Sequence, residues 1–262
     1  LTIDSEQTRH YLYGNVGSHL IGYLGRITPK QAKDPSYDGV PAQSFIGQWG
    51  VEKLYDKRLR GTPGRKVIEV DALGRQLRLL TEEPPQKGKD LFLGMDINLQ
   101  LAAEAAFQNR AGALVAIKPK TGEVLGLVSL PSFNPNLFSR GIDPTEWERL
   151  SRGKRFPLLN RALQSQYPPG STFKIMTAIA ALESEAITPK DKVNCTGIIR
   201  SGRWTFGCWK GGGHGKISLH RAIVESCDIY FYKAGETVGI DAIAEYAHRF
   251  GLGKPTGIPL VK

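Results

Sequence analysis

Apolar residues from residue 90 onward recur in patterns that predict alternating helices and strands. The apolar runs 112–117 and 124–129 flank a turn at 119–122, which predicts an antiparallel hairpin with a buried first strand. Asp96 is placed to cap a helix that runs to about Asn109. Further helices are expected at 142–150, 218–225, 228–238 and 241–250, and a short strand at 90–95.

An apolar stretch in this part of the chain begins directly after a proline-glycine turn. Pro168 and Pro169 cannot continue a preceding helix, and Gly170 allows a tight turn. The run 175–182 predicts a helix with little polar surface, which is typical of a helix buried inside a domain. Ser171 and Lys174 lie three residues apart at the start of this helix and therefore share one face. A hydroxyl and an amine held together on a buried helix form a nucleophile with a candidate base.

The first 89 residues show a different pattern, with short apolar runs, many glycines and no long helical period. The expected elements are a strand at 19–25, a helix at 46–59 and a hairpin of strands 66–71 and 75–80. The Pro- and Gly-containing loop at 84–88 marks a boundary. We therefore expect one small domain over 1–89 and a second domain over 90–262.

Composition and charge change this picture little. Apolar residues make up 40% of the 262 residues and charged residues 23%, which is ordinary for a globular protein and excludes disorder of the whole chain. The net charge of +10 can suit nucleic acid, but the basic cluster 53–66 lacks a series of interleaved aromatic residues, so we expect no nucleic-acid binding. No apolar run is long enough to span a bilayer, and the chain starts at Leu1 rather than Met, so we expect a piece of a longer protein.

A second polar stretch can complete the candidate site. Ser226 and Asp228 lie two residues apart at the junction of two expected helices, where both side chains can point into one cleft. Helix capping alone also explains residues of this type at such a junction. Two other short sequences with serine, lysine or threonine are excluded as parts of this site. Ser151-x-x-Lys154 has the same spacing as Ser171 and Lys174, but no apolar helix follows it. Lys-Thr-Gly at 120–122 lies at the expected hairpin turn.

Together the two stretches resemble the penicillin-binding transpeptidases. Tyr-Pro-Pro-Gly-Ser-Thr-Phe-Lys at 167–174 matches the Ser-x-x-Lys signature of that family. Ser-Cys-Asp at 226–228 stands where Ser-x-Asn is commoner, and we interpret the Asp as the mark of a subclass. Residues 112–129 resemble the first hairpin of the transpeptidase sheet, and residues 19–25 and 46–64 resemble the non-catalytic pedestal of class B members. Residues 131–138 and 213–215 resemble the elongation-type members, called penicillin-binding protein 2. The resemblance covers nearly the whole chain.

The resemblance implies a fold and a reaction. The fold is an α+β pedestal over 1–89, followed over 90–262 by part of an α/β transpeptidase domain of the penicillin-binding and serine β-lactamase type, with helices packed on an antiparallel sheet. The reaction is D,D-transpeptidation, in which an acyl-enzyme forms with D-alanyl-D-alanine stem peptides and peptidoglycan is cross-linked during cell elongation. Binding of penicillin and other β-lactams is also implied. Because the family's Lys-Thr/Ser-Gly motif is expected after Lys262, we expect the 262-residue chain itself to be nearly inactive.

The resemblance also implies a role for each candidate residue. Ser171 attacks a carbonyl carbon, and Lys174 is the base that takes its proton. Ser226 relays a proton between Lys174 and the leaving amine, and Asp228 hydrogen-bonds either Lys174 or the substrate amide. The backbone N–H of Ser171 is a candidate oxyanion donor. No cofactor is expected for the chemistry.

The implied location of the parent protein is the periplasmic face of the bacterial inner membrane, with a single N-terminal anchor outside this chain. Its implied partners are a SEDS-family glycosyltransferase and a scaffold protein of the elongation machinery that binds the pedestal. Two other functions stay open. One is a serine β-lactamase or penicillin sensor, which shares the nucleophile, and the other is a non-catalytic interaction fragment whose pedestal is the working part.

Three cysteines and one histidine lie in or beside a glycine-rich stretch with few apolar residues. Because such a stretch cannot be held by a hydrophobic core, we expect a metal ion or a disulfide to stabilise it. Cys195, Cys208, His214 and Cys227 form a Cys₃His set, the donor set of closed structural zinc sites, although their spacing matches no short zinc-finger pattern. A disulfide between Cys195 and Cys208 would leave Cys227 unpaired. Structural zinc, this disulfide and free thiols stay open, in that order. A site that uses Cys227 would also hold the stretch beside Ser226.

Overall fold

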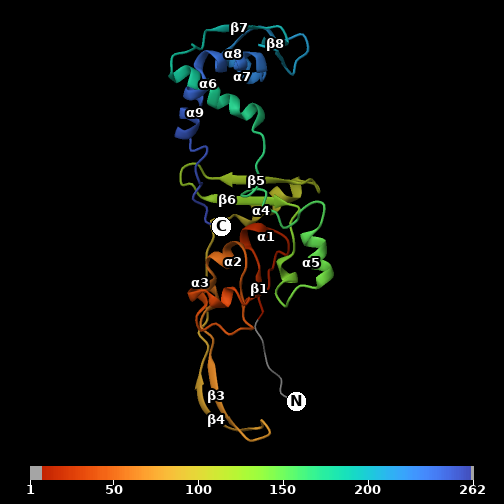
Figure 1. Ribbon diagram of the computed structural model, residues 1–262, viewed down its shortest axis with the longest axis vertical. Helices are drawn as coiled ribbons and strands as arrows, with labels where there is room; N and C mark the ends of the chain where they lie inside the picture. The colour runs from red at the N-terminus through yellow and green to blue at the C-terminus, as the bar shows by residue number, and fades with distance from the viewer. Residues whose placement is uncertain (1–7, 261–262) are drawn as a thin grey trace. The chain divides into compact units, whose positions relative to one another are not determined.

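The computed structural model describes residues 8–260, and these residues divide into two units (Figure 1). Tyr167–Ile258 form the second unit, and the residues up to Gln166 together with 259–260 form the first. None of the helices in the described part of the chain is long and apolar enough to cross a bilayer. Each sheet in the described residues pairs two strands, so the architecture is a mixture of helices and small antiparallel sheets, as the sequence predicted.

The first unit begins with a helix where the sequence favoured a strand. The prediction of a strand over 19–25 is wrong for its first half, because helix α1 (Ser18–Ile21) precedes strand β1 (Leu24–Arg26). Gly22 separates the two elements with a φ of 84°, and a Cβ atom there would lie 1.8 Å from the Trp49 carbonyl oxygen. Only glycine allows both this backbone conformation and this close approach.

The expected helix over 46–59 is also divided. The segment contains strand β2 (Phe45–Gly47) and helices α2 (Gly50–Leu54) and α3 (Asp56–Arg60). Strand β2 pairs antiparallel with β1, and the buried carboxylate of Asp56 accepts a hydrogen bond from the Gly47 N–H at 2.8 Å. The first turn of α3 is therefore tied back to the strand, which a continuous helix would not permit.

Two predicted hairpins are present in the first unit. They consist of β3 (Arg65–Val70) with β4 (Gln76–Glu83), and β5 (Gly112–Ile117) with β6 (Val124–Leu130). Both pairs are antiparallel, and the β3–β4 hairpin extends away from helices α1–α3 (Figure 1). No strand forms over 90–95, where the described backbone is irregular up to the helix cap at Asp96.

The packing of helix α4 (Ile97–Ala106) determines which strand of the β5–β6 hairpin is buried. Asp96 caps it as predicted, by accepting hydrogen bonds from the N–H groups of Asn98 and Leu99. The buried Gln100 side chain donates to the Leu127 carbonyl oxygen at 3.0 Å and accepts from the Leu127 N–H at 2.9 Å. Because α4 packs against β6, β6 is the buried strand, and the prediction of a buried β5 is wrong.

The remainder of the first unit forms a small aromatic core. Helix α5 (Pro144–Ser151) and the 3₁₀ turns η1 (Gln31–Lys33), η2 (Pro35–Tyr37) and η3 (Pro135–Leu137) complete its elements. Phe133, Phe138 and Leu150 are buried together, and the Tyr23 ring stacks on Phe138 with ring centroids 4.1 Å apart. This cluster links α5 to the segment around β1.

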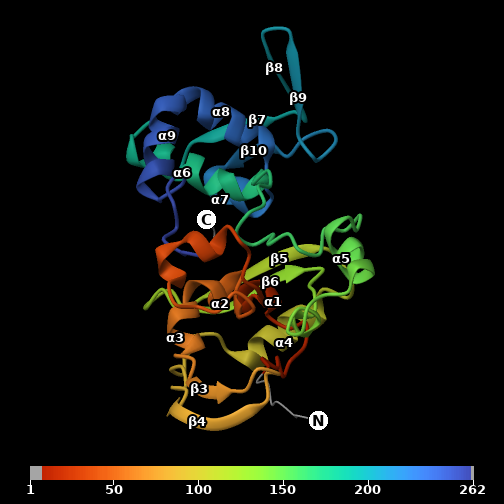
Figure 2. The ribbon, with the colours of Figure 1, turned by 60° about the horizontal axis from the view of Figure 1, so that its bottom comes forward.

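The second unit contains four helices that the sequence predicted and two strand pairs that it did not. The helices are α6 (Lys174–Glu183), α7 (Leu219–Val224), α8 (Asp228–Val238) and α9 (Ile240–Arg249). The strand pairs are β7 (Lys192–Cys195) with β10 (Gly215–Ser218), and β8 (Ile198–Ser201) with β9 (Trp204–Gly207). The core of this unit gathers buried residues from β7, β10 and helices α6–α8, and the β8–β9 hairpin extends away from it (Figure 2).

Candidate functional site

Ser171 lies in a single 3₁₀ turn, η4 (Gly170–Phe173), that leads directly into α6. Gly170 adopts a left-handed φ of 57°, and the Thr172 hydroxyl donates to the Pro169 carbonyl oxygen at 2.6 Å, which closes the turn. The sequence placed Ser171 on the α-helix itself. The structure instead presents it on an exposed tight turn just before the helix, because the helix begins only at Lys174.

Lys174 is the first residue of α6, and its ammonium group reaches the junction between α7 and α8. Its Nζ donates to Asp228 Oδ1 at 2.6 Å, to Ser226 Oγ at 3.0 Å and to the Ser226 carbonyl oxygen at 2.8 Å. The Ser226 hydroxyl donates to Ser171 Oγ at 2.9 Å. The structure thus brings together all four residues nominated from the sequence, with Ser226 between Ser171 and Lys174.

Ser226 has an unusual backbone conformation. Its φ is 50°, in the left-handed region that residues with a side chain rarely adopt. The turn is supported by the next residue, since the Cys227 N–H donates to the Ala222 carbonyl oxygen at 2.9 Å. As a result both oxygen atoms of Ser226 face the same lysine, which an extended connection between two helices would not achieve.

The charge of Asp228 is stabilised by its surroundings. Partial burial raises the pKa of this carboxyl, but hydrogen bonds from Lys174 and from the Trp209 N–H, together with the Lys174 charge, outweigh that effect. The pKa of Asp228 therefore lies below its ordinary value, and the group is ionised at neutral pH. Lys174 and Asp228 form a half-buried ion pair next to the Ser171 and Ser226 hydroxyls.

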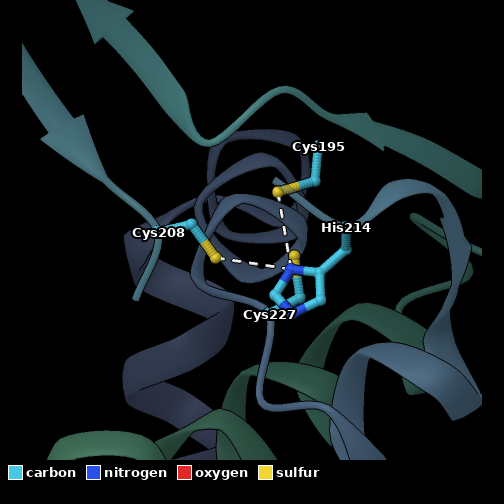
Figure 3. Close-up of side chains that lie close together, drawn as sticks. All are labelled: Cys195, Cys208, His214 and Cys227. Carbon is cyan, nitrogen blue, oxygen red and sulfur yellow. Dashed lines mark hydrogen bonds between the residues drawn. The ribbon is translucent and has the colours of Figure 1, made fainter. Parts of the chain in front are cut away.

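The four sulfur- and imidazole-bearing residues nominated from the sequence also lie together (Figure 3). Cys195 ends β7, Cys208 follows β9, His214 precedes β10 and Cys227 immediately precedes α8. Their ligand atoms all lie within 4.8 Å of one another, and the structure records the three cysteines as free thiols. The cluster can therefore hold a metal ion.

The donor geometry fits a tetrahedral metal ion. His214 Nδ1 lies 3.6 Å from Cys195 Sγ and 3.5 Å from Cys208 Sγ. Metal–sulfur and metal–nitrogen bonds of about 2.3 and 2.05 Å separate tetrahedral S and N donors by about 3.6 Å. The other ring nitrogen, Nε2, is buried without a hydrogen bond and lies 3.8 Å from Glu225 Oε2, which suits the carboxylate–histidine–metal arrangement.

The thiols themselves also favour a cation. Burial, followed by the neighbouring Cys195 and Cys208, raises the pKa of Cys227 to about 12, whereas at Cys208 burial is outweighed by backbone hydrogen bonds, which lower its pKa. Three thiolates cannot share this space without a positive charge to offset them. A divalent cation removes this obstacle, because it binds the thiolates directly.

Gly213 controls how His214 approaches the cluster. It has a φ of 82°, and a Cβ atom there would lie 2.1 Å from the Cys195 carbonyl oxygen. We expect Gly213→Ala to lower the melting temperature of the 262-residue chain by about 5 °C, because the strain of a left-handed alanine is about 1–3 kcal/mol. Gly211→Ala is the matched control, since a Cβ atom at Gly211 meets nothing within 4 Å. Equal melting curves for the two variants would contradict the prediction.

Two contacts of the site were not foreseen. The Trp209 backbone N–H donates to Asp228 Oδ2 at 3.0 Å, and its indole N–H donates to the Glu225 carbonyl oxygen at 2.9 Å. Glu225 additionally faces His214. The only sequence signal for Trp209 is its position directly after Cys208 in a glycine-rich stretch.

Comparison with known proteins was made at the level of family, sequence and structure. Residues 112–262 match the family described as "Penicillin binding protein transpeptidase domain", and residues 1–93 match "Penicillin-binding Protein dimerisation domain". The peptidoglycan D,D-transpeptidase MrdA of Acinetobacter baumannii is 42% identical over 98% of this chain and 39% of its own length. MrdA of Escherichia coli K12 is 37% identical over 97% of this chain and 41% of its own length. The chain thus spans about two fifths of the curated relatives that it matches.

Solved structures with similar folds include two that contain a penicillin-binding protein 2 with a second component. The complex between Helicobacter pylori PBP2 and MreC has a TM-score of 0.83 at 34% identity, covering 95% of this chain and 46% of that one. Pseudomonas aeruginosa PBP2 in complex with WCK 5153 has a TM-score of 0.78 at 37% identity, covering 95% of this chain and 52% of that one.

Proposed function

The chain belongs to the penicillin-binding transpeptidases of the MrdA, or penicillin-binding protein 2, type, and from that premise we propose that its protein is a peptidoglycan D,D-transpeptidase of cell elongation. The observation that carries the proposal is the hydrogen-bonded series from Ser171 through Ser226 and Lys174 to Asp228. We keep a domain boundary near residue 89 as part of the proposal. The two family matches, which end at 93 and begin at 112, are compatible with it, whereas the two units of the structure divide after Gln166.

In the proposed reaction Ser171 Oγ attacks the carbonyl carbon between the two D-alanines of a stem peptide. The C–O bond of the acyl-enzyme forms and the peptide C–N bond breaks. Lys174 in its neutral form takes the Ser171 proton, and Ser226, whose Oγ is hydrogen-bonded to both Ser171 Oγ and Lys174 Nζ, relays that proton from Lys174 to the departing D-alanine amine. Asp228 holds Lys174 in reach of Ser226. The amine of a second stem peptide then takes the acyl group, which completes the cross-link and restores Ser171.

Covalent labelling with fluorescent penicillin tests this proposal in the full-length gene product. We expect Ser171→Ala to abolish the label, because the attacking oxygen is removed. Ser151→Ala is the matched control, since Ser151 belongs to the other Ser-x-x-Lys match and lies exposed on α5. Label that persists in Ser171→Ala would overturn the proposal. Rapid release of the label from the wild-type protein would favour a serine β-lactamase instead.

We further propose that the Cys195, Cys208, His214 and Cys227 cluster holds structural zinc. The donor set is that of closed zinc sites, and the nitrogen–sulfur separations of 3.6 and 3.5 Å suit tetrahedral zinc. When bound, zinc would supply cross-links within the glycine-rich stretch and no chemistry at the substrate. A disulfide between Cys195 and Cys208 is the competing state.

The proposed partners are a scaffold protein that binds the pedestal and a SEDS-family glycosyltransferase. Support comes from two similar structures, the PBP2–MreC complex of Helicobacter pylori and a peptidoglycan synthase complex that coordinates polymerisation and crosslinking. We also propose that the protein acts at the periplasmic face of the inner membrane, held by an anchor outside the chain described here.

A further inference from the structure

We propose that Trp209 is a positioning residue that holds Asp228 in the orientation in which it binds Lys174. The inference rests on the proposed function, since it concerns how the site keeps its geometry ready for acylation. It starts from the loop between Cys208 and His214, whose contacts with the α7–α8 junction none of the predicted residue roles require.

The Asp228 carboxylate is held from two sides. Its Oδ1 accepts from Lys174 Nζ at 2.6 Å, while its Oδ2 accepts from the Trp209 backbone N–H at 3.0 Å. Because the two donors use different oxygen atoms, rotation of the carboxylate breaks both hydrogen bonds. The hydrogen bond from the Trp209 N–H therefore stabilises the side-chain orientation in which Asp228 also accepts a hydrogen bond from Lys174.

The indole group fixes the position of that backbone N–H. Trp209 Nε1–H donates to the Glu225 carbonyl oxygen at 2.9 Å, and Glu225 directly precedes Ser226. Trp209 thus contacts the chain on both sides of Ser226, once at the end of α7 and once at the start of α8. The residue is 67% exposed, so burial of the ring contributes little, and the polar contacts are what the indole adds to the site.

The same loop begins and ends in the metal-binding cluster. Cys208 immediately precedes Trp209, and the Trp209 ring lies edge-on to His214 with ring centroids 5.5 Å apart. The contact between Cys208 Sγ and His214 Nδ1 at 3.5 Å therefore limits the movement of Trp209, which lies between these residues in the chain. The cluster also reaches Asp228 directly, since Cys227 precedes it in the chain, and Trp209 adds a second connection on the side of Cys208 and His214.

The first test uses penicillin acylation of the full-length gene product, with the dissociation constant and the acylation rate constant measured separately. Trp209→Phe keeps an aromatic ring and removes the indole N–H. We expect its acylation rate constant to fall about three- to tenfold, the effect of one neutral hydrogen bond, with the dissociation constant unchanged and the melting temperature lowered by no more than about 4 °C. Trp204→Phe, at a similarly exposed tryptophan of β9, should match the wild type. Equal rate constants for the two variants would overturn the inference.

The second test needs no activity. In the 262-residue chain, NMR hydrogen exchange of the Trp209 amide should become faster in Asp228→Ala, because its acceptor is gone. The Cys208 amide, which donates to the Gly197 carbonyl oxygen at 2.7 Å, is the internal control and should stay protected. An unchanged Trp209 exchange rate contradicts the inference. If Ser171→Ala retains its penicillin label, the proposed function fails, and the exchange result alone then decides whether Trp209 holds Asp228.

Discussion

Replacing Lys174 with methionine should slow acylation of Ser171 by penicillin about 10²–10⁴-fold, the range for loss of a general base. The change keeps most of the side-chain volume and removes the group that donates to Ser226 and Asp228. Ser171 then has no base to take its proton. The measurement is the rate constant of covalent labelling in the full-length gene product under single-turnover conditions.

The control for this variant is Lys233→Met. Lys233 lies on α8, pairs with Glu236 at 3.0 Å and is exposed, so the substitution removes the same charge without touching the site. We expect labelling by this control at the wild-type rate. A Lys174→Met variant that labels within tenfold of the control would show that the proton of Ser171 goes elsewhere.

Removing the proposed zinc ion should lower the melting temperature of the 262-residue chain by about 10 °C. An ion present at about 1,000 times its dissociation constant adds about 4 kcal/mol of stability, and each kcal/mol shifts the melting temperature of a domain this size by about 2–4 °C. The measurement compares the chain before and after chelation, with zinc content determined by elemental analysis. Zinc should restore the transition when it is added back.

A single ligand substitution gives the same result by another route. His214→Ala should melt at the temperature of the chelated chain and no longer respond to chelator, because the imidazole ligand is lost. His220→Ala is the control, since His220 is an exposed histidine on α7. A chain without zinc and with a mass lower by two hydrogens would contradict the metal assignment and favour the disulfide.

The residues of the candidate site could be nominated from the sequence because each motif is local. Ser171 with Lys174, and Ser226 with Asp228, lie within four residues of each other, and the turns around them are marked by proline, glycine or a helix end. The contact between the two motifs depends on how α6 and α8 pack, which no local pattern encodes. The resemblance to a known family supplied that link.

The elements that were predicted wrongly share a physical cause. The α1 segment and the division at Tyr55 depend on close approaches to other parts of the chain, such as that of Gly22 to Trp49. The burial of β6 rather than β5 depends on the side on which α4 packs. Trp209 was missed because its most important donor is a backbone N–H, which every non-proline residue carries.

The left-handed backbone at Ser226 sits at the start of three consecutive residues with separate tasks. Ser226 contacts Lys174 and Ser171, Cys227 belongs to the sulfur cluster, and Asp228 forms the ion pair with Lys174. A substitution that lowers drug acylation here also disturbs a donor set or a buried charge that the folded unit requires. For the transpeptidase proposed above, few substitutions in this tripeptide would therefore lower acylation without also disturbing the folded unit.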